Sequence, residues 1–98
     1  MDELISVIIK EPGKKPKQKT IKNTLHAFQQ TVNGHIEVFP IGAGIIGVVN
    51  EDGIAMGLPE NCEICGHRIF GTLIMCATEG EDFAGLPQWV DLEEEVTK

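Results

Sequence analysis

The sequence predicts an α+β fold: a mixed or antiparallel sheet of about five strands, with one helix packed on a face and a short C-terminal helix. Two observations predict this class. Short β-branched apolar runs are separated by turn residues along most of the chain, and one segment carries its apolar residues at helical spacing. Since 98 residues are about the usual size of one domain, we expect residues 1–98 to form a single domain around one core.

The first expected element is a strand. Residues Leu4 to Ile9 (LISVII) are apolar on both faces, as in the central strand of a sheet. Residues 10–19 follow, with two prolines and a glycine among lysines. Because proline interrupts both helices and central strands, we interpret residues 10–19 as a flexible basic loop.

An amphipathic helix is predicted from Thr20 to Val32. Its apolar residues recur at intervals of four, three and four positions: Ile21, Leu25, Phe28 and Val32. Thr20 or Asn23 is the expected N-cap, and Asn33-Gly34 supplies the left-handed backbone that commonly ends a helix. We expect this helix to pack its apolar stripe on the sheet.

A hairpin is predicted next. His35 to Ile41 and Ile45 to Asn50 are rich in β-formers and flank the turn Gly42 to Gly44. Gly42 to Gly47 also spells G-x-G-x-x-G, the letters of a dinucleotide-binding fingerprint. That fingerprint needs a helix to begin in the glycine loop, and β-branched residues follow instead. We therefore interpret the glycines as part of the hairpin.

The remaining segments predict a strand and a helix. Glu51-Asp52-Gly53 forms a turn, and Gly57 to Asn61 interrupts regular structure again. Arg68 to Thr78 is apolar at nearly every position, which favours a buried strand. Pro87 suits the first turn of a short C-terminal helix with three large apolar residues: Trp89, Val90 and Leu92.

Charge is distributed unevenly along the chain. The net charge is −7, yet six of the eight basic residues lie between Lys10 and Lys22. An acidic body repels phosphate backbones, and the lysines have no aromatic neighbours for base stacking, so nucleic-acid binding is disfavoured. Two interpretations of the basic segment stay open: a solvated loop, or an anion-binding site formed by Lys14, Lys15, Lys17 and Lys19.

The sequence favours a cytoplasmic location. Its longest apolar stretches are far shorter than the roughly 20 residues of a membrane span, so we expect no membrane partner. The first residues lack the basic region and small-residue cleavage site of a signal peptide. Three cysteines are an odd number and form no closed disulfide framework, so we expect free thiols in a reducing compartment.

One cluster has metal-ligand chemistry. Cys62, Cys65 and His67 form the pattern C-x-x-C-x-H, and Cys76 would complete a tetrahedral zinc site. However, Cys65 and His67 would lie on one side of an extended segment, whereas Cys76 would point to the opposite face of its strand. Without Cys76 the site needs a donor from elsewhere, such as His35 or a partner chain. Zinc bound by Cys62, Cys65 and His67 therefore stands beside the alternative of no cofactor and ordinary free cysteines.

Three stretches carry a family resemblance: Thr31 to Val38, Asn50 to Asn61, and Ile69-Phe70-Gly71-Thr72 leading to Gly80-Glu81-Asp82-Phe83. With them the chain resembles, from Leu4 to about Leu86, the family called domain of unknown function 3846 of bacterial, plasmid and phage genomes. The resemblance implies a compact α+β domain and a mobile-element context, and it supplies no catalytic residues. The chain departs from the family pattern at the cysteine pair near Cys62, so a metal site there would be particular to this protein.

No catalytic constellation is evident. Cys62 or Cys65 could pair with a histidine, but no motif fixes such a pair, and we expect no enzyme. The first hypothesis is a non-catalytic binding or interaction module of phage or mobile-element type, acting on a host protein or a small ligand. A zinc-stabilised domain and a small enzyme with an unrecognised site are the alternatives.

We also expect a homodimer. A chain of this size buries only about 60–65% of its unfolded surface alone, and a small sheet leaves an edge to protect. Trp89, Val90 and Leu92, or an edge strand, would form the two-fold interface. The alternative is that the C-terminal helix folds over its own sheet.

Overall fold

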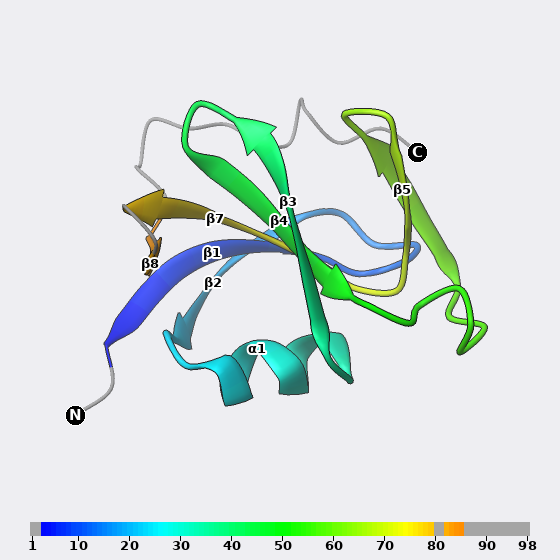
Figure 1. Cartoon of the computed structure of the whole chain (residues 1–98), viewed down its shortest axis with the longest axis horizontal. Helices are drawn as coiled ribbons and strands as arrows, with labels where there is room; N and C mark the ends of the chain where they lie inside the picture. The colour runs from blue at the N-terminus through cyan, green and yellow to red at the C-terminus, as the bar shows by residue number, and fades with distance from the viewer. Residues whose placement is uncertain (1–2, 80–81, 86–98) are drawn as a thin grey trace.

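The computed structural model describes residues 3–79 and 82–85 of the chain (Figure 1). In that part of the chain the elements are, in order, β1 (Leu4–Lys10), β2 (Lys17–Lys22), α1 (Leu25–Val32), β3 (Ile36–Gly42), β4 (Ile45–Asn50), β5 (Glu60–Ile64), β6 (His67–Phe70), β7 (Leu73–Glu79) and β8 (Asp82–Ala84).

The strands of these described residues form a six-stranded sheet and a separate two-stranded sheet, the β5–β6 hairpin. The order in the large sheet is β2-β1-β7-β4-β3, with β8 paired to β7, and every pair is antiparallel. Because β1 lies between β2 and β7, the interior strand predicted at the start of the chain is confirmed. The α+β class is confirmed as well.

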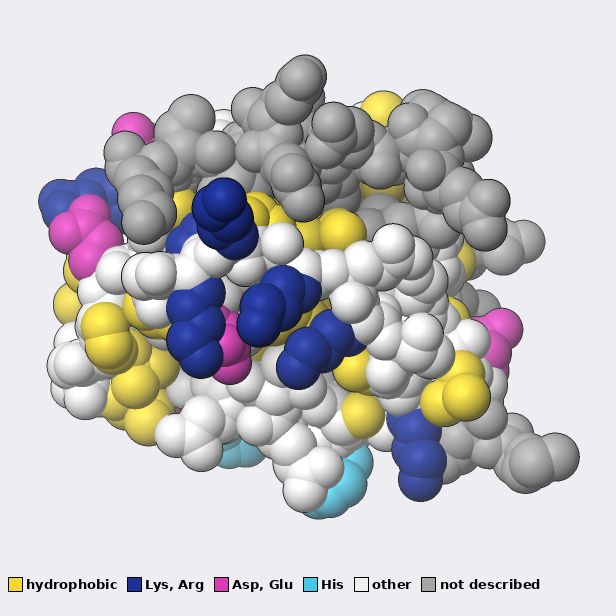
Figure 2. Space-filling view, turned by 180° about the vertical axis from the view of Figure 1, so that it is seen from behind, with side chains coloured by type: hydrophobic (Ala, Val, Ile, Leu, Met, Phe, Trp, Pro, Cys, Tyr) yellow, Lys and Arg dark blue, Asp and Glu magenta, His cyan; other side chains and the backbone are white. Residues whose placement is uncertain are grey.

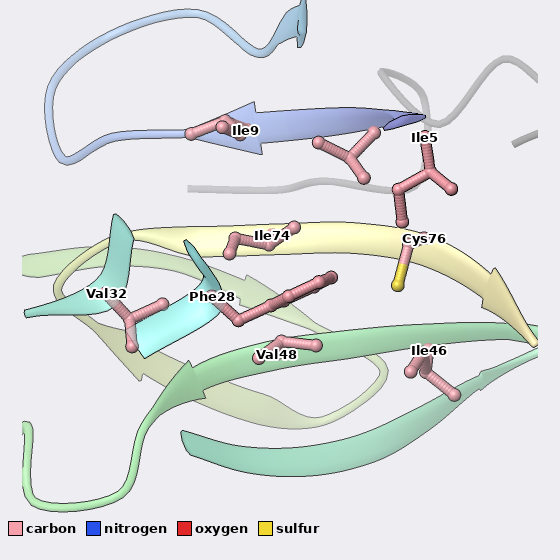
Figure 3. Close-up of a cluster of buried hydrophobic side chains, with 9 residues drawn as sticks. Ile5, Ile9, Phe28, Val32, Ile46, Val48, Ile74 and Cys76 are labelled. Carbon is pink, nitrogen blue, oxygen red and sulfur yellow. The ribbon is translucent and has the colours of Figure 1, made fainter. Parts of the chain in front are cut away.

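Both faces of the large sheet are covered. Helix α1 packs on one face, where Phe28 and Val32 join a cluster with β7 residues Ile74 and Cys76. Figure 3 shows the ring of Phe28 between Ile74 of β7 and Val48 of β4. All five of these side chains are buried, so the sheet and helix share one apolar layer.

The β5–β6 hairpin covers the opposite face. Leu73 and Met75 of β7 alternate with the residues that face α1, and they pack on a second cluster formed by hairpin residues Cys62, Ile64 and Ile69. This second layer explains why the strand sequences are apolar at successive positions: both faces of β4 and β7 are buried.

The helix is shorter than predicted. It begins at Leu25 with Thr24 as the N-cap, whose side chain accepts a hydrogen bond from the Ala27 amide. Neither Thr20 nor Asn23 caps it, because residues up to Lys22 belong to β2. The predicted end is confirmed, since Asn33 is the C-cap with left-handed backbone at φ 64°.

The flexible loop predicted at residues 10–19 is wrong at both ends. Lys10 is the last residue of β1, and Lys17–Lys22 forms β2, antiparallel to β1. The prolines lie in the connection between these strands, where they interrupt no ladder. Ile21, read as the start of the helical stripe, instead packs against the core from β2.

The single strand predicted over Arg68 to Thr78 is two strands. Gly71 has φ 89°, and the chain changes sheets there, from β6 in the small hairpin to β7 in the large sheet. The segment around Asn61, interpreted as an interruption, is the strand β5.

The hairpin of β3 and β4 is confirmed. Ala43 and Gly44 turn the chain with φ 53° and 76°, so the G-x-G-x-x-G letters are a hairpin turn and part of a return strand. The C-terminal helix predicted after Pro87, with its dimer contact through Trp89, Val90 and Leu92, lies outside the described residues. Among the described residues no helix is long and apolar enough to cross a membrane.

Candidate binding pocket

A pocket of about 390 Å³ lies where the small hairpin meets the end of the large sheet. Its walls come from the end of β4, the turn that follows β4, strand β6, and Glu37 of β3. We call residues Glu51 to Gly57 the pocket turn, because they run from β4 toward β5 and residues 51–55 form one side of the cavity.

Asn50 fixes the start of the pocket turn. It is buried, its Nδ2 donates hydrogen bonds to the carbonyl oxygens of Val32 (3.1 Å) and Asn33 (3.0 Å), and its Oδ1 accepts one from the Asp52 amide (2.7 Å). One amide side chain therefore satisfies the C-terminus of α1 and orients the pocket turn. Gly34 makes room for it, since a Cβ on Gly34 would lie 2.6 Å from Asn50 Nδ2.

Gly53 brings the pocket turn close to β6. A Cβ at this position would lie 2.7 Å from the carbonyl oxygen of Phe70, which is backbone and has little freedom to move. Glycine is therefore required for the turn and β6 to approach closely enough to form the two sides of the pocket.

The inner surface of the pocket is apolar. Val49 of β4 and Ile69 of β6 are buried beneath it, and Phe70 is partly exposed along one side. Ile54 of the pocket turn is 74% exposed although it is a large aliphatic residue, so it adds an apolar lip that faces water. Apolar side chains without a covering element are typical of binding surfaces.

The rim of the pocket is acidic. Glu37, Glu51 and Asp52 line it and are all exposed. Arg68 lines it too, but its guanidinium donates to Glu60 Oε2 through Nη2 (2.7 Å) and Nε (3.2 Å). This hydrogen bond raises the pKa of Arg68 above its ordinary value.

Arg68 is also held by an aromatic ring. Its Cζ lies 5.7 Å from the ring centroid of Phe70, within cation–π distance. Glu60 and Phe70 are therefore the partners of the Arg68 guanidinium. Three carboxylates line the pocket against this one cation, so the charge of the rim is negative. The pocket therefore favours a positively charged occupant.

Cys62, Cys65 and His67, the predicted zinc ligands, occupy different environments in the β5–β6 hairpin. Cys62 is buried in the cluster under the hairpin, where burial raises the pKa of its thiol and the nearby Lys10 opposes that shift. Cys65 is exposed in the turn of the hairpin with φ 51°, so it does not continue an extended segment with His67.

The other members of the proposed zinc site lie apart as well. The ring of His67 packs 4.6 Å from that of Phe39, and Cys76 is buried on the α1 side of the sheet. Burial raises the pKa of the Cys76 thiol to about 12. The described residues contain no group of three or more His, Cys, Asp or Glu side chains arranged to hold a metal ion.

The predicted anion-binding lysines lie on one hairpin. Lys17 and Lys19 are in β2, and Lys14 and Lys15 precede it. Figure 2 shows that several Lys and Arg side chains gather on one side of the molecule. Lys14 forms an exposed ion pair of 3.2 Å with Glu11, and its hydrogen bond lowers the pKa of the Glu11 carboxyl.

Sequence reasoning missed the pocket. It identified Glu51 and Asp52 only as turn residues, and it gave no role to Glu37 or Arg68. One feature of the sequence could have indicated a role for Arg68. It is the single Lys or Arg residue between Asn23 and Lys98, in an otherwise acidic part of the chain. The approach of β6 to the pocket turn depends on tertiary structure and has no local sequence pattern.

These features define a small α+β domain whose two-sided sheet carries a charged, apolar-lined pocket. The chain matches the family described as "Domain of unknown function (DUF3846)" over residues 5–97, and it belongs to that family. No curated protein and no solved structure matches it.

Proposed function

We propose that this protein is a non-catalytic binding module of a mobile genetic element, which acts in the cytoplasm by taking a basic side chain of a host protein into the pocket. The observation that carries the proposal is the combination, in one cavity, of an apolar interior with a rim of three exposed carboxylates.

This combination suits lysine or arginine in particular. Both have a long aliphatic stem that packs on apolar surface and a charged end that stays near water. The stem would lie on Val49 and Ile69, and the cation would reach Glu51 and Asp52 at the rim. The ion pair between Arg68 and Glu60 leaves the rim carboxylates available for that cation.

A protein partner fits better than a small molecule. Ile54 and Met56 of the pocket turn are 74% and 51% exposed. Ile54 lines the cavity, and with Met56 two positions further along the same turn it offers an apolar surface to a larger partner. Among the described residues that line the cavity there is no histidine or cysteine, so the pocket offers no cysteine–histidine pair of the kind that the sequence left open. Both observations support binding over catalysis.

The test uses fluorescence anisotropy with a short labelled peptide that contains arginines, and a matched peptide with glutamates in their place. We expect the basic peptide to bind and the acidic one to bind far more weakly at this pocket. The double variant Glu51→Gln/Asp52→Asn should weaken binding of the basic peptide by about tenfold, since rim charges contribute modestly in water.

The matched control changes the same number of charges elsewhere. Glu3→Gln/Glu11→Gln also raises the net charge by two, and neither residue lines the cavity. If this control variant loses as much affinity as the rim variant, only the overall charge matters and the proposed pocket is wrong. Failure of the wild-type protein to bind the basic peptide contradicts the proposal directly.

A further inference from the structure

Strand β2 is an edge strand. In the part of the chain that the structure describes, it pairs only with β1, through six consecutive residue pairs from Leu4–Lys22 to Ile9–Lys17 without a bulge. Every side chain of β2 except Ile21 is exposed. Alternate backbone N–H and C=O groups of such a strand point away from its neighbour and can pair with another extended chain.

The lysines of β2 lie on defined faces. Lys17 and Lys19 are opposite Ile9 and Val7, whose side chains belong to the core cluster on the α1 side of the sheet. Lys17 and Lys19 therefore stand on the α1 side of this edge, two residues apart. Lys22 is opposite Leu4. It lies on the other face of the strand, because it is an odd number of residues from both Lys17 and Lys19.

This charge pattern selects what can pair with the edge. If β2 paired with β2 of a second copy, lysines would be brought against lysines, and directly opposed like charges destabilise a sheet. Lysines on an edge strand are a known device against such self-association. A strand with carboxylates at alternate positions reverses the sign of each cross-strand pair and makes the same edge favourable.

We propose that β2 is a docking site for an acidic extended segment of a partner protein, which adds to the large sheet as a further strand. Its acidic residues, spaced two apart, face Lys17 and Lys19. This site is independent of the pocket, since β2 and β3 are opposite edges of the large sheet and Glu37 of the pocket lies on β3.

The observations favour a peptide over a nucleic acid. A peptide strand uses the backbone groups of the edge as well as the lysines, whereas a nucleic acid uses only the charges. The net charge of −7 repels a phosphate backbone at long range, and β2 has no aromatic side chain on which a base could stack.

The test is an NMR titration of the uniformly ¹⁵N-labelled full chain with three synthetic peptides. In the first peptide, glutamate alternates with valine or threonine. The second peptide has lysine at each glutamate position. The third has the same composition as the first, but its glutamates are consecutive. We expect the alternating acidic peptide alone to shift the β2 amides and to slow their hydrogen exchange.

Charge reversal on the protein gives the decisive comparison. Lys17→Glu/Lys19→Glu should weaken the alternating acidic peptide by about tenfold or more and should allow the lysine peptide to bind. Lys22→Glu is the control on the same strand. It reverses one charge and should change affinity less than Lys17→Glu or Lys19→Glu alone, because Lys22 lies on the other face.

Several outcomes overturn the proposal. Equal binding of the blocked and alternating acidic peptides shows charge attraction without strand pairing. Tighter binding of a single-stranded oligonucleotide of equal charge, measured in the same titration, shows a nucleic-acid site. Shifts that avoid β2, or no binding of any acidic peptide, show that the edge has no such partner.

Discussion

Lys10 and Asn61 are 51 positions apart in the sequence and exchange hydrogen bonds in the interior of the protein. Lys10 Nζ donates to Asn61 Oδ1 over 2.9 Å, and Asn61 Nδ2 donates to the backbone oxygen of Lys10 over 2.7 Å. Asn61 Nδ2 also donates to the oxygen of Gly71 over 2.7 Å. One buried amide thus joins β1 of the large sheet, β5 of the hairpin and the connection between β6 and β7.

Replacing Asn61 with leucine should destabilise the protein. The change keeps the approximate size of the side chain, but it removes one acceptor from a buried ammonium group and leaves two buried carbonyls without this donor. We expect the free energy of unfolding in urea to fall by about 3 kcal/mol. Asn61→Asp should not restore the lost stability, because it retains an acceptor for Lys10 but places a carboxylate oxygen against the two carbonyl oxygens that Nδ2 faces. A loss below about 1 kcal/mol for Asn61→Leu would contradict this account.

Gly53→Ala should disturb the pocket. The new methyl group would meet the Phe70 carbonyl at 2.7 Å, so the pocket turn or β6 must move. We expect a loss of about 2–3 kcal/mol in unfolding free energy and weaker binding of the basic peptide. Gly57→Ala in the same turn is the control: it has φ +70° but no neighbour within 4 Å. Backbone strain alone should cost it about 1 kcal/mol, with little change in peptide affinity.

The stability of the protein should fall at high pH because of Cys76. The folded thiol keeps its proton up to a pKa of about 12, whereas an unfolded cysteine loses it near its ordinary value of 9.0. Between these values the folded state binds more protons than the unfolded state, so stability decreases as pH rises.

The slope from this one thiol should approach about 1.4 kcal/mol per pH unit. The free energy of unfolding in urea, measured at several pH values for the wild type and for Cys76→Val, isolates the contribution of Cys76, because other titrating groups contribute equally to both proteins. The valine variant should lose less stability as pH rises through this range. Parallel curves for the two proteins would show that Cys76 does not titrate differently on folding.

The three cysteines should differ in reactivity. Cys65 is exposed in the hairpin turn, whereas Cys62 and Cys76 are buried and their thiols have raised pKa values. A disulfide exchange reagent should therefore label one thiol per chain quickly in the native protein, and Cys65→Ser should remove that fast phase. Fast labelling that persists in Cys65→Ser would mean that a buried thiol is accessible. Protection of Cys65 that a chelator removes would instead favour the zinc hypothesis.

The fold could be predicted where the pattern was local. Asn33-Gly34 ends the helix, and the glycine turn before Ile45 forms a hairpin, because left-handed backbone restricts residue choice at both places. Thr20 to Lys22 has the pattern of a helix start, because Ile21 matches the helical stripe, but six residue pairs with β1 hold this segment in β2. Tertiary pairing therefore decided the start of the helix.

The candidate site was less accessible to sequence reasoning. The apolar run from Arg68 to Thr78 gave no period that separates two strands, and only Gly71 with its positive φ marks the change of sheet. If the chain did not change sheets at Gly71, β6 would not face the pocket turn, and Arg68 would not line the same cavity as Glu51. The position of Cys65 was hidden for a related reason: it is a turn residue of the hairpin, which its spacing from Cys62 does not reveal.

The central claim is that the cavity at Glu51 and Asp52 receives a basic side chain. Amide chemical shifts recorded while the arginine peptide is added to the ¹⁵N-labelled protein test it most directly. We expect the largest shifts at residues 49–55 and 68–70, with the β2 amides unchanged. Shifts spread evenly over the acidic surface, or centred away from the pocket, would contradict the claim.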